Sequence, residues 1–353
     1  MAAHKIEVAI ILQGGGALGA YEWGAIRCLI EHGYVPKFVS GVSIGAMNAA
    51  AVAGAPDGDM VGCLDQLWKA ITLRDNPFFP AKQPAWLSMF GNPAFWASRS
   101  DLFNAMRWTS TCEVNPMRKT LADIIDFERL NDPLGVHIGV NSTSVRTGDI
   151  HRFRSTQMRI TAEHILASGA LPPNFPAVEI DGELYWDGGL SNNTPVKTLL
   201  SMMSAQEQAS TPIFCVDLFP AKGALPLNLM DVQNRMTEIQ YESRLSNYIN
   251  DLSDVIDLLH PDGVKSSIDS GHTLLETLKN IHVIHAPHAP MTGAMDFSEY
   301  GVKQRRDIGY VAMDDYLSAN KAALTTQPAK AAVAPKPRPG KAAAATAVAV
   351  EVA

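Results

Sequence analysis

The chain has 353 residues, 46% of them hydrophobic and 18% charged, and its formal net charge is −7. This composition is that of a globular protein long enough for one large or two medium cores, and its negative charge argues against binding nucleic acid through a broad positive field. The four cysteines are scattered without C-x-x-C spacing, so we expect neither a zinc site nor a disulfide framework but reduced thiols, as in a cytoplasmic protein.

The start of the chain does not resemble a secretory leader. Glu7 interrupts it, and the apolar run Val8–Leu12 leads into glycines rather than into a cleavage site. No stretch reaches the roughly 18 apolar residues of a membrane span. We therefore expect a cytoplasmic protein whose membrane contact is at most peripheral.

The N-terminal segment predicts two strand–helix units in succession. Ile6–Gln13 is β-branched and almost continuously apolar, as in a buried parallel strand, and Leu18–His32 has helical spacing of its apolar residues. Phe38–Val42 predicts a second strand, and the Ala-rich Ile44–Ala53 predicts a closely packed helix. This order favours a parallel α/β sheet.

Similar patterns continue along the chain. Asp181-Gly182 between two short apolar runs predicts a hairpin. Asp231–Leu259 predicts one long amphipathic helix that covers the sheet or, alternatively, mediates dimerisation. The other predicted helices are 60–73, 115–127, 162–168 and 298–318, and the other predicted strands are 135–141, 150–154, 177–180, 184–186, 212–218 and 281–285.

Two segments differ in amino-acid composition from the rest of the chain. Asn76–Ser98 combines six aromatic residues with prolines that forbid a long regular element, so we expect an irregular segment packed on the sheet, with a cap over an acyl pocket or a membrane-touching lip as the alternative.

Residues 321–353 are rich in Ala, Pro and Lys and carry net charge +4, which leaves −11 for the remainder. Such a tail buries too little to fold alone; we expect it to be flexible, or to touch an anionic membrane or granule surface loosely.

The pentapeptide Gly41-Val42-Ser43-Ile44-Gly45 lies directly between a predicted strand and a predicted helix. A serine alcohol is a weak nucleophile near neutral pH and needs a base beside it. The G-x-S-x-G spacing places the serine on a tight, strained turn, where small residues two positions away on either side avoid a collision. We therefore predict that Ser43 is a nucleophile and that Gly41 and Gly45 form its elbow.

A first glycine-rich turn, GGGALG at residues 14–19, follows the first predicted strand. The amides of Gly14, Gly15 and Gly16 are unobstructed by side chains and suit an oxyanion hole. The same G-x-G-x-x-G spacing marks dinucleotide sites, but these need an acid at the end of the second strand. This chain has SGVS there, so the serine elbow occupies the place of the ribose-binding acid and we favour the oxyanion loop.

The general base has a weaker local signal. Asp187 follows a predicted strand and precedes Gly188 and Gly189, which let the backbone approach another loop closely. An aspartate with its ordinary pKa near 3.9 is a weak base, so a direct Ser–Asp dyad needs a desolvated site. The alternative base is one of the later histidines, which would complete a Ser-Asp-His order but lie in no recognisable catalytic turn: His272, His282, His285 and His288.

Together the motifs GGGALG, GVSIG and ASGALPPNFPAVEIDGELYWDGGLSNNTPV resemble the patatin-like phospholipase family. The resemblance covers about Val8–Ala50 and Ala162–Pro195, and DFSEYGVKQRRDIGY further on resembles the C-terminal extension of a bacterial subgroup. It implies a three-layer α/β/α hydrolase with a mainly parallel central sheet, a Ser43–Asp187 dyad without catalytic histidine, and no metal or other cofactor. Leu18 departs from the family pattern, in which many members carry Arg or Lys at this point of the first loop.

The sequence thus predicts a serine acyl hydrolase of the lipid esterase or phospholipase A type, acting on a lipid or another acyl ester. A short-chain or hydroxyacyl esterase or thioesterase with the same dyad, and a non-catalytic lipid- or granule-associated protein of the same fold, remain alternatives. We expect a catalytic core at residues 6–200, a C-terminal part of the same domain with a helical extension at 201–320, and the tail at 321–353. The pattern does not predict an oligomeric state.

Overall fold

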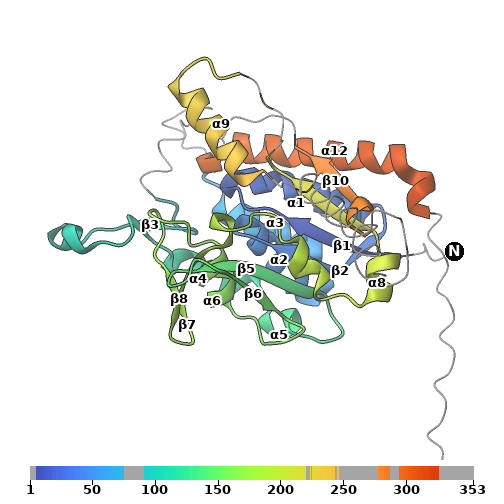
Figure 1. The fold of residues 1–353 in the computed structure, drawn as a ribbon, viewed down its shortest axis with the longest axis horizontal. Helices are drawn as coiled ribbons and strands as arrows, with labels where there is room; N and C mark the ends of the chain where they lie inside the picture. The colour runs from blue at the N-terminus through green and yellow to red at the C-terminus, as the bar shows by residue number, and fades with distance from the viewer. Residues whose placement is uncertain are drawn as a thin grey trace, which may run out of the picture.

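One eight-stranded sheet organises the described part of the protein, with strand order β10-β9-β1-β2-β5-β8-β7 and β6 paired to β5 (Figure 1). The computed structural model describes residues 5–74, 91–219, 223, 225–242, 245, 277–286 and 294–325. The strands of this sheet are β1 (Ile6–Leu12), β2 (Tyr34–Gly41), β5 (His137–Ser144), β6 (Ile150–Arg154), β7 (Val178–Ile180), β8 (Glu183–Asp187), β9 (Ile213–Asp217) and β10 (Ile281–His285).

Helices and a small second sheet surround this framework. The α-helices are α1 (Ala20–Glu31), α2 (Ile44–Ala53), α3 (Met60–Ile71), α4 (Asn115–Ile124), α5 (Phe127–Leu130), α6 (Ala162–Ser168), α7 (Val196–Leu200), α8 (Ala205–Ser210), α9 (Leu229–Tyr241) and α12 (Glu299–Thr325). Short 3-10 helices are η1 (Gly16–Gly19), η2 (Pro56–Gly58), η4 (Leu102–Arg107) and η5 (Gly188–Leu190), and β3 (Ala97–Ser98) pairs with β4 (Cys112–Glu113).

The sheet has a parallel half and an antiparallel half. The strands β10, β9, β1, β2 and β5 pair with one another in this order, and each of these pairs is parallel. The strands β6 and β8 pair antiparallel with β5, and β7 pairs antiparallel with β8. The hairpin between β7 and β8 turns at Asp181 and Gly182, both with positive φ (52° and 81°), as the Asp-Gly pair predicts. The expected mainly parallel α/β sheet is confirmed.

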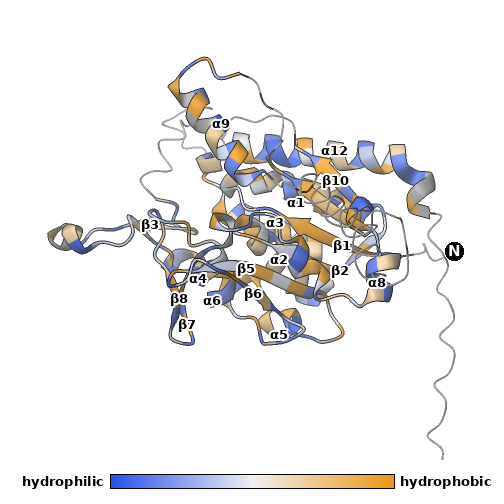
Figure 2. Cartoon of the chain, in the orientation of Figure 1, coloured by the Kyte–Doolittle hydropathy of each residue, from blue (hydrophilic) through white to orange (hydrophobic). Residues whose placement is uncertain are grey.

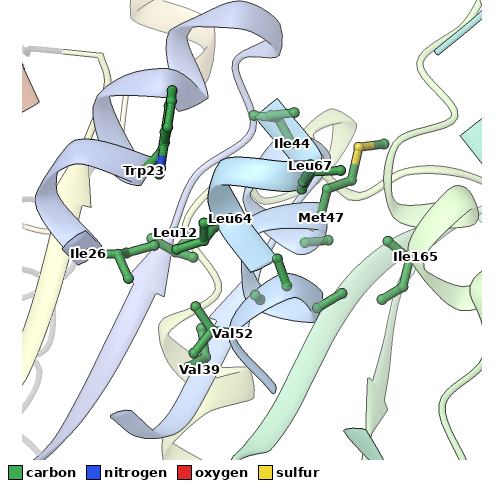
Figure 3. Close-up of a cluster of buried hydrophobic side chains, with 14 of the residues drawn as sticks. Leu12, Trp23, Ile26, Val39, Ile44, Met47, Val52, Leu64, Leu67 and Ile165 are labelled. Atoms are coloured by element: carbon green, nitrogen blue, oxygen red, sulfur yellow. The ribbon is translucent and has the colours of Figure 1, made fainter. Parts of the chain in front are cut away.

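Alternate side chains of β1 pack into two separate hydrophobic clusters, one on each face of the sheet, which explains why this strand is apolar throughout. Val8, Ile10 and Leu12 join the larger cluster, to which α1, α2, α3, α6 and α12 contribute. Figure 2 shows the central strands as predominantly hydrophobic, and Figure 3 shows side chains of α1, α2, α3 and α6 gathered around Leu12 and Val39. Ala9 and Ile11 face the smaller cluster, which includes Leu199 of α7. Helices on both faces make the three layers.

The helix predicted over Asp231–Leu259 is wrong as a single element. The helix α9 ends at Tyr241, and Glu242 has extended backbone (φ −50°, ψ 142°). Its apolar residues Val232, Met236 and Ile239 are exposed rather than packed on the sheet. Residues 246–259 lie outside the described residues.

Two further predictions concern segments that the structure describes only in part. Within Asn76–Ser98 the described Phe95 and Trp96 are buried against Phe175 and Phe297, as expected of a packed irregular segment, whereas residues 75–90 lie outside the described residues. The closing helix α12 continues through Lys321 to Thr325; residues 326–353 are not described. In the described part of the chain, no helix is long and apolar enough to cross a bilayer.

Candidate functional site

Strand register places three loops at the same level of one sheet edge. Leu12 of β1 pairs with Gly41 of β2, and Gly41 pairs with Val140 of β5. Two residues further along each strand lie Gly14, Ser43 and Ser142, and Ser142 pairs with Asp187 of β8. The carboxyl ends of parallel strands therefore meet the end of one antiparallel strand, and the sequence motifs converge there.

Ser43 occupies a sharp turn between β2 and α2. Its backbone has φ 53° and ψ −122°, a conformation that costs a non-glycine residue on the order of 1–3 kcal/mol. The two elbow glycines are required by close approach: a Cβ on Gly41 would lie 2.3 Å from the Gly45 carbonyl oxygen, and a Cβ on Gly45 2.6 Å from that of Gln13. The Ser43 amide donates to the carbonyl and hydroxyl oxygens of Ser168 at 3.0 and 3.1 Å, which holds the turn in place.

Asp187, the last residue of β8, is almost completely buried. Burial raises its pKa from the usual 3.8 to about 7, against the opposing effects of hydrogen bonds from the Gly189 amide and the Ser43 side chain. The Gly189 amide donates to Oδ1 of Asp187 at 2.7 Å. The Thr143 hydroxyl donates to the Asp187 carbonyl at 2.9 Å. The desolvation that a direct Ser–Asp pair needs is present at this carboxylate.

The two glycines after Asp187 serve different contacts. A Cβ on Gly188 would lie 2.4 Å from the Asn141 carbonyl oxygen, so this position must approach β5 without a side chain. Gly189 supplies the amide for Asp187 and lies beside Tyr241 of α9. The dyad-loop glycines of the sequence therefore pack the loop onto the sheet and hold the carboxylate.

The first glycine turn is bound to the Asp187 loop through Asn193. The Gly14 amide donates to Oδ1 of Asn193 at 2.9 Å, and Nδ2 of Asn193 donates to the Gly14 carbonyl at 3.1 Å. Gly14 thus has an acceptor already, whereas no acceptor is found among the described residues for the amides of Gly15 and Gly16. A Cβ on Gly16, whose φ is +56°, would lie 2.3 Å from the Ala294 carbonyl oxygen.

A buried polar network joins this turn to α2, the helix that follows Ser43. Glu22 of α1 accepts from the Gln13 amide at 2.7 Å and from Nδ2 of Asn48 at 2.9 Å. Asn48, on α2, accepts from the Trp68 indole at 2.8 Å, and the Gln13 side chain donates to the Thr194 hydroxyl at 2.8 Å. Burial raises the pKa of Glu22 well above its usual range, and the two hydrogen bonds oppose this rise. Sequence patterns do not reveal these partners.

The histidines considered as alternative bases are engaged elsewhere. Nδ1 of His285 lies 2.9 Å from Oδ2 of Asp217, and Nδ1 of His282 lies 3.0 Å from the Tyr316 hydroxyl. Burial raises the pKa of Asp187, the hydrogen bonds from the Gly189 amide and the Ser43 side chain lower it, and no histidine among the described residues contributes. His272 and His288 lie outside the described residues.

One cluster in the described residues has metal-ligand residue types. The ligand atoms of Cys28, His32 and Asp314 lie within 4.8 Å of one another, between α1 and α12. His32 already bridges the Cys28 carbonyl and Asp314. The contacts are those of a helix end and do not indicate a metal site.

Comparison with known proteins identifies a family. Its model, described as patatin-like phospholipase, matches residues 10–200. A patatin-like phospholipase domain-containing protein of Caenorhabditis elegans is 27% identical over 197 residues, which make up 55% of this chain and 13% of that protein. The lysophospholipase NTE1 of Saccharomyces cerevisiae is 26% identical over 239 residues, 64% of this chain and 12% of that protein.

The similarity to solved structures is lower. VipD from Legionella pneumophila has a TM-score of 0.43 and 17% sequence identity, and the match covers 88% of this chain and 67% of that chain. The chain spans only a small part of the length of the two curated relatives above.

Proposed function

This chain belongs to the patatin-like phospholipase family, and from this premise we propose that it is a lipid acyl hydrolase in which Ser43 and Asp187 form the catalytic dyad. The observation that carries the proposal is the buried Asp187 carboxylate, whose pKa of about 7 makes it a competent base near neutral pH and whose side-chain partner is Ser43.

In the first step the Ser43 hydroxyl oxygen attacks the ester carbonyl carbon while Asp187 takes the hydroxyl proton. Asp187 then gives this proton to the leaving alcohol, and the acyl group remains on Ser43. In the second step Asp187 takes a proton from water, which attacks the acyl-enzyme. Release of the fatty acid returns the proton to Ser43, so the enzyme ends unchanged.

We assign the oxyanion donors to Gly15 and Gly16 and give Gly14 a positioning role. The Gly14 amide already donates to Asn193, whereas the next two amides have no acceptor among the described residues. The N-terminus of α2, directly after Ser43, adds a favourable dipole for the developing negative charge. Removing one such donor costs on the order of 10² to 10³ in rate.

Hydrolysis of nitrophenyl esters tests this function. We expect Ser43→Ala and Asp187→Asn each to lower turnover by about 10² or more, whereas the surface substitutions Ser210→Ala and Asp181→Asn leave it unchanged. Equal turnover in all four variants would show that Ser43 and Asp187 do not carry out the hydrolysis. A series of acyl chain lengths then distinguishes a long-chain lipid hydrolase from a short-chain or hydroxyacyl esterase.

A further inference from the structure

Residues 97–113 form a projection, here called the finger, that presents apolar side chains to solvent. β3 and β4 form its base and η4 lies at its tip. Figure 1 shows it as the teal segment that extends furthest to the left of the sheet. Phe103 and Met106 in η4 are fully exposed. Isolated exposed apolar residues are ordinary on protein surfaces, but two at the tip of a projection have no core to join.

The helix α9 is oriented the opposite way from an ordinary surface helix. Such a helix turns its apolar stripe inward and its charges outward. Here Arg235 and Glu238 pair with each other at 2.9 Å with side chains only 21% and 13% exposed. Met236 on the other side of the helix is 66% exposed. The apolar face of α9 consists of Leu229, Val232, Met236 and Ile239, and the lead-in residues Leu225 and Leu227 are exposed as well.

The finger is joined to the loop that holds the dyad. The Thr111 amide donates to the Pro173 carbonyl at 3.0 Å, and the Cys112 amide donates to that of Asn174 at 2.9 Å. The same loop follows Ser168, which accepts from the Ser43 amide. Its Ala170 carbonyl accepts from the Asp187 amide at 3.0 Å.

The helix α9 reaches the site from another element. Its last residue, Tyr241, accepts through its carbonyl from Nδ2 of Asn193 at 3.4 Å. The Tyr241 ring packs 5.7 Å from that of Phe219 and lies beside Gly189. Both apolar projections therefore connect directly to the loops that carry the candidate site.

Four of the seven charged residues on the two projections form ion pairs within them, and the other three, Arg107, Glu113 and Asp231, carry a net charge of −1. Arg99 lies 3.0 Å from Asp101 in the finger, and Arg235 pairs with Glu238 in α9. The whole chain has net charge −7, which disfavours approach to an anionic surface. An uncharged or zwitterionic partner with an apolar interior fits this surface.

We propose that the finger and the apolar face of α9 together form the surface that docks on a zwitterionic phospholipid membrane and positions the dyad over it. Exposed apolar residues that enter the bilayer anchor the protein by the hydrophobic effect, with little dependence on salt. The choice of a lipid surface as partner rests on the proposed lipid hydrolysis, whereas the reversed helix and the apolar finger are independent of it.

Flotation with phosphatidylcholine vesicles tests the proposal in a Ser43→Ala background, so that the vesicles are not hydrolysed. The variants are Phe103→Asp with Met106→Asp in the finger, and Leu229→Asp with Met236→Asp in α9. Leu134→Asp is the matched control, because Leu134 is almost as exposed as Phe103 and Met106 but precedes the first residue of β5, at the opposite end of that strand from the candidate site. Thermal melting confirms that each variant folds.

We expect each double variant to lower vesicle partitioning by about 100-fold, since a buried Phe or Met contributes roughly tenfold or more in affinity. The Leu134 control and an increase in salt should have little effect. With Ser43 intact, turnover of a soluble short-chain ester should stay within about twofold of the unmodified protein, while turnover of vesicle lipid falls with binding.

Three results would overturn the proposal. The first is that the Ser43→Ala protein without further substitutions does not bind the vesicles. The second is that the double variants bind as well as the Leu134→Asp control. The third is that the substitutions convert a dimer to a monomer without changing vesicle binding, in which case a second copy covers this surface. Failure of the proposed function has a different signature, because then Ser43→Ala leaves ester turnover unchanged whatever the vesicle result.

Discussion

Replacing Asp187 with Asn should remove activity and increase stability at the same time. The buried carboxylate has a pKa of about 7, raised from 3.8 by burial. Between these two pH values the folded protein holds a proton that the unfolded chain has lost, so stability falls as pH rises through this window. Above about pH 7 the whole cost of the buried charge is present.

The size of the pKa shift of Asp187 determines the expected difference in stability. At about 1.36 kcal/mol for each unit of pKa, ionising Asp187 in the folded state costs up to about 4 kcal/mol. Asn has the same shape, carries no charge, and its oxygen can still accept from the Gly189 amide. We therefore expect Asp187→Asn to exceed the unmodified protein in unfolding free energy by about 2–4 kcal/mol near pH 8, and the two to converge near pH 4.

Two assays check this together. Urea unfolding at a series of pH values gives the stability difference, and ester hydrolysis gives the rate. Turnover by the unmodified protein should rise with pH through an apparent pKa near 7, as Asp187 loses its proton. If Asp187→Asn is inactive but also less stable at every pH, the residue has a structural role and the reasoning from its desolvation is refuted.

Three other substitutions probe the remaining parts of the site. Gly16→Ala should lower turnover by about 10²-fold or more, because the added Cβ would collide with the Ala294 carbonyl oxygen. Gly148→Ala is the control, since Gly148 also has a positive φ but open space around it, and it should leave turnover unchanged. Equal effects of the two substitutions would contradict the oxyanion assignment. Ser43→Gly should unfold with about 1 kcal/mol more free energy than Ser43→Ala, since glycine relieves the strained φ of 53°, and denaturant titration showing no difference would argue against strain. His285→Gln should keep ester turnover within about threefold, because His285 pairs with Asp217; a loss comparable to that of Asp187→Asn would restore a histidine base.

The two glycine-rich turns of the candidate site could be predicted from sequence because each turn is local. The residues of GVSIG and GGGALG act through the backbone of the turns that they form, and strand periodicity places both turns at one sheet edge. Asp187 lies 144 positions after Ser43 in the chain. Its local pattern, an aspartate between a predicted strand and two glycines, is a weaker signal, to which the family resemblance adds.

The supporting contacts could not be predicted because they join distant segments. Asn193 bonds Gly14 across 179 positions of the chain, and Ser168 bonds Ser43 across 125. Nothing in the neighbourhood of either residue indicates its partner. For α9 the periodicity predicts an amphipathic helix correctly, but periodicity does not say which face turns outward, and the usual assumption of a buried apolar face is wrong here.

Covalent trapping of the nucleophile tests the central claim most directly. The protein is treated with a fluorophosphonate, which reacts with activated serine, and the modified residue is located by peptide mass spectrometry. The dyad predicts labelling at Ser43, faster as pH rises through about 7, and slower by about 10² or more in Asp187→Asn. Labelling at another residue, or an equal rate in Asp187→Asn, would contradict it.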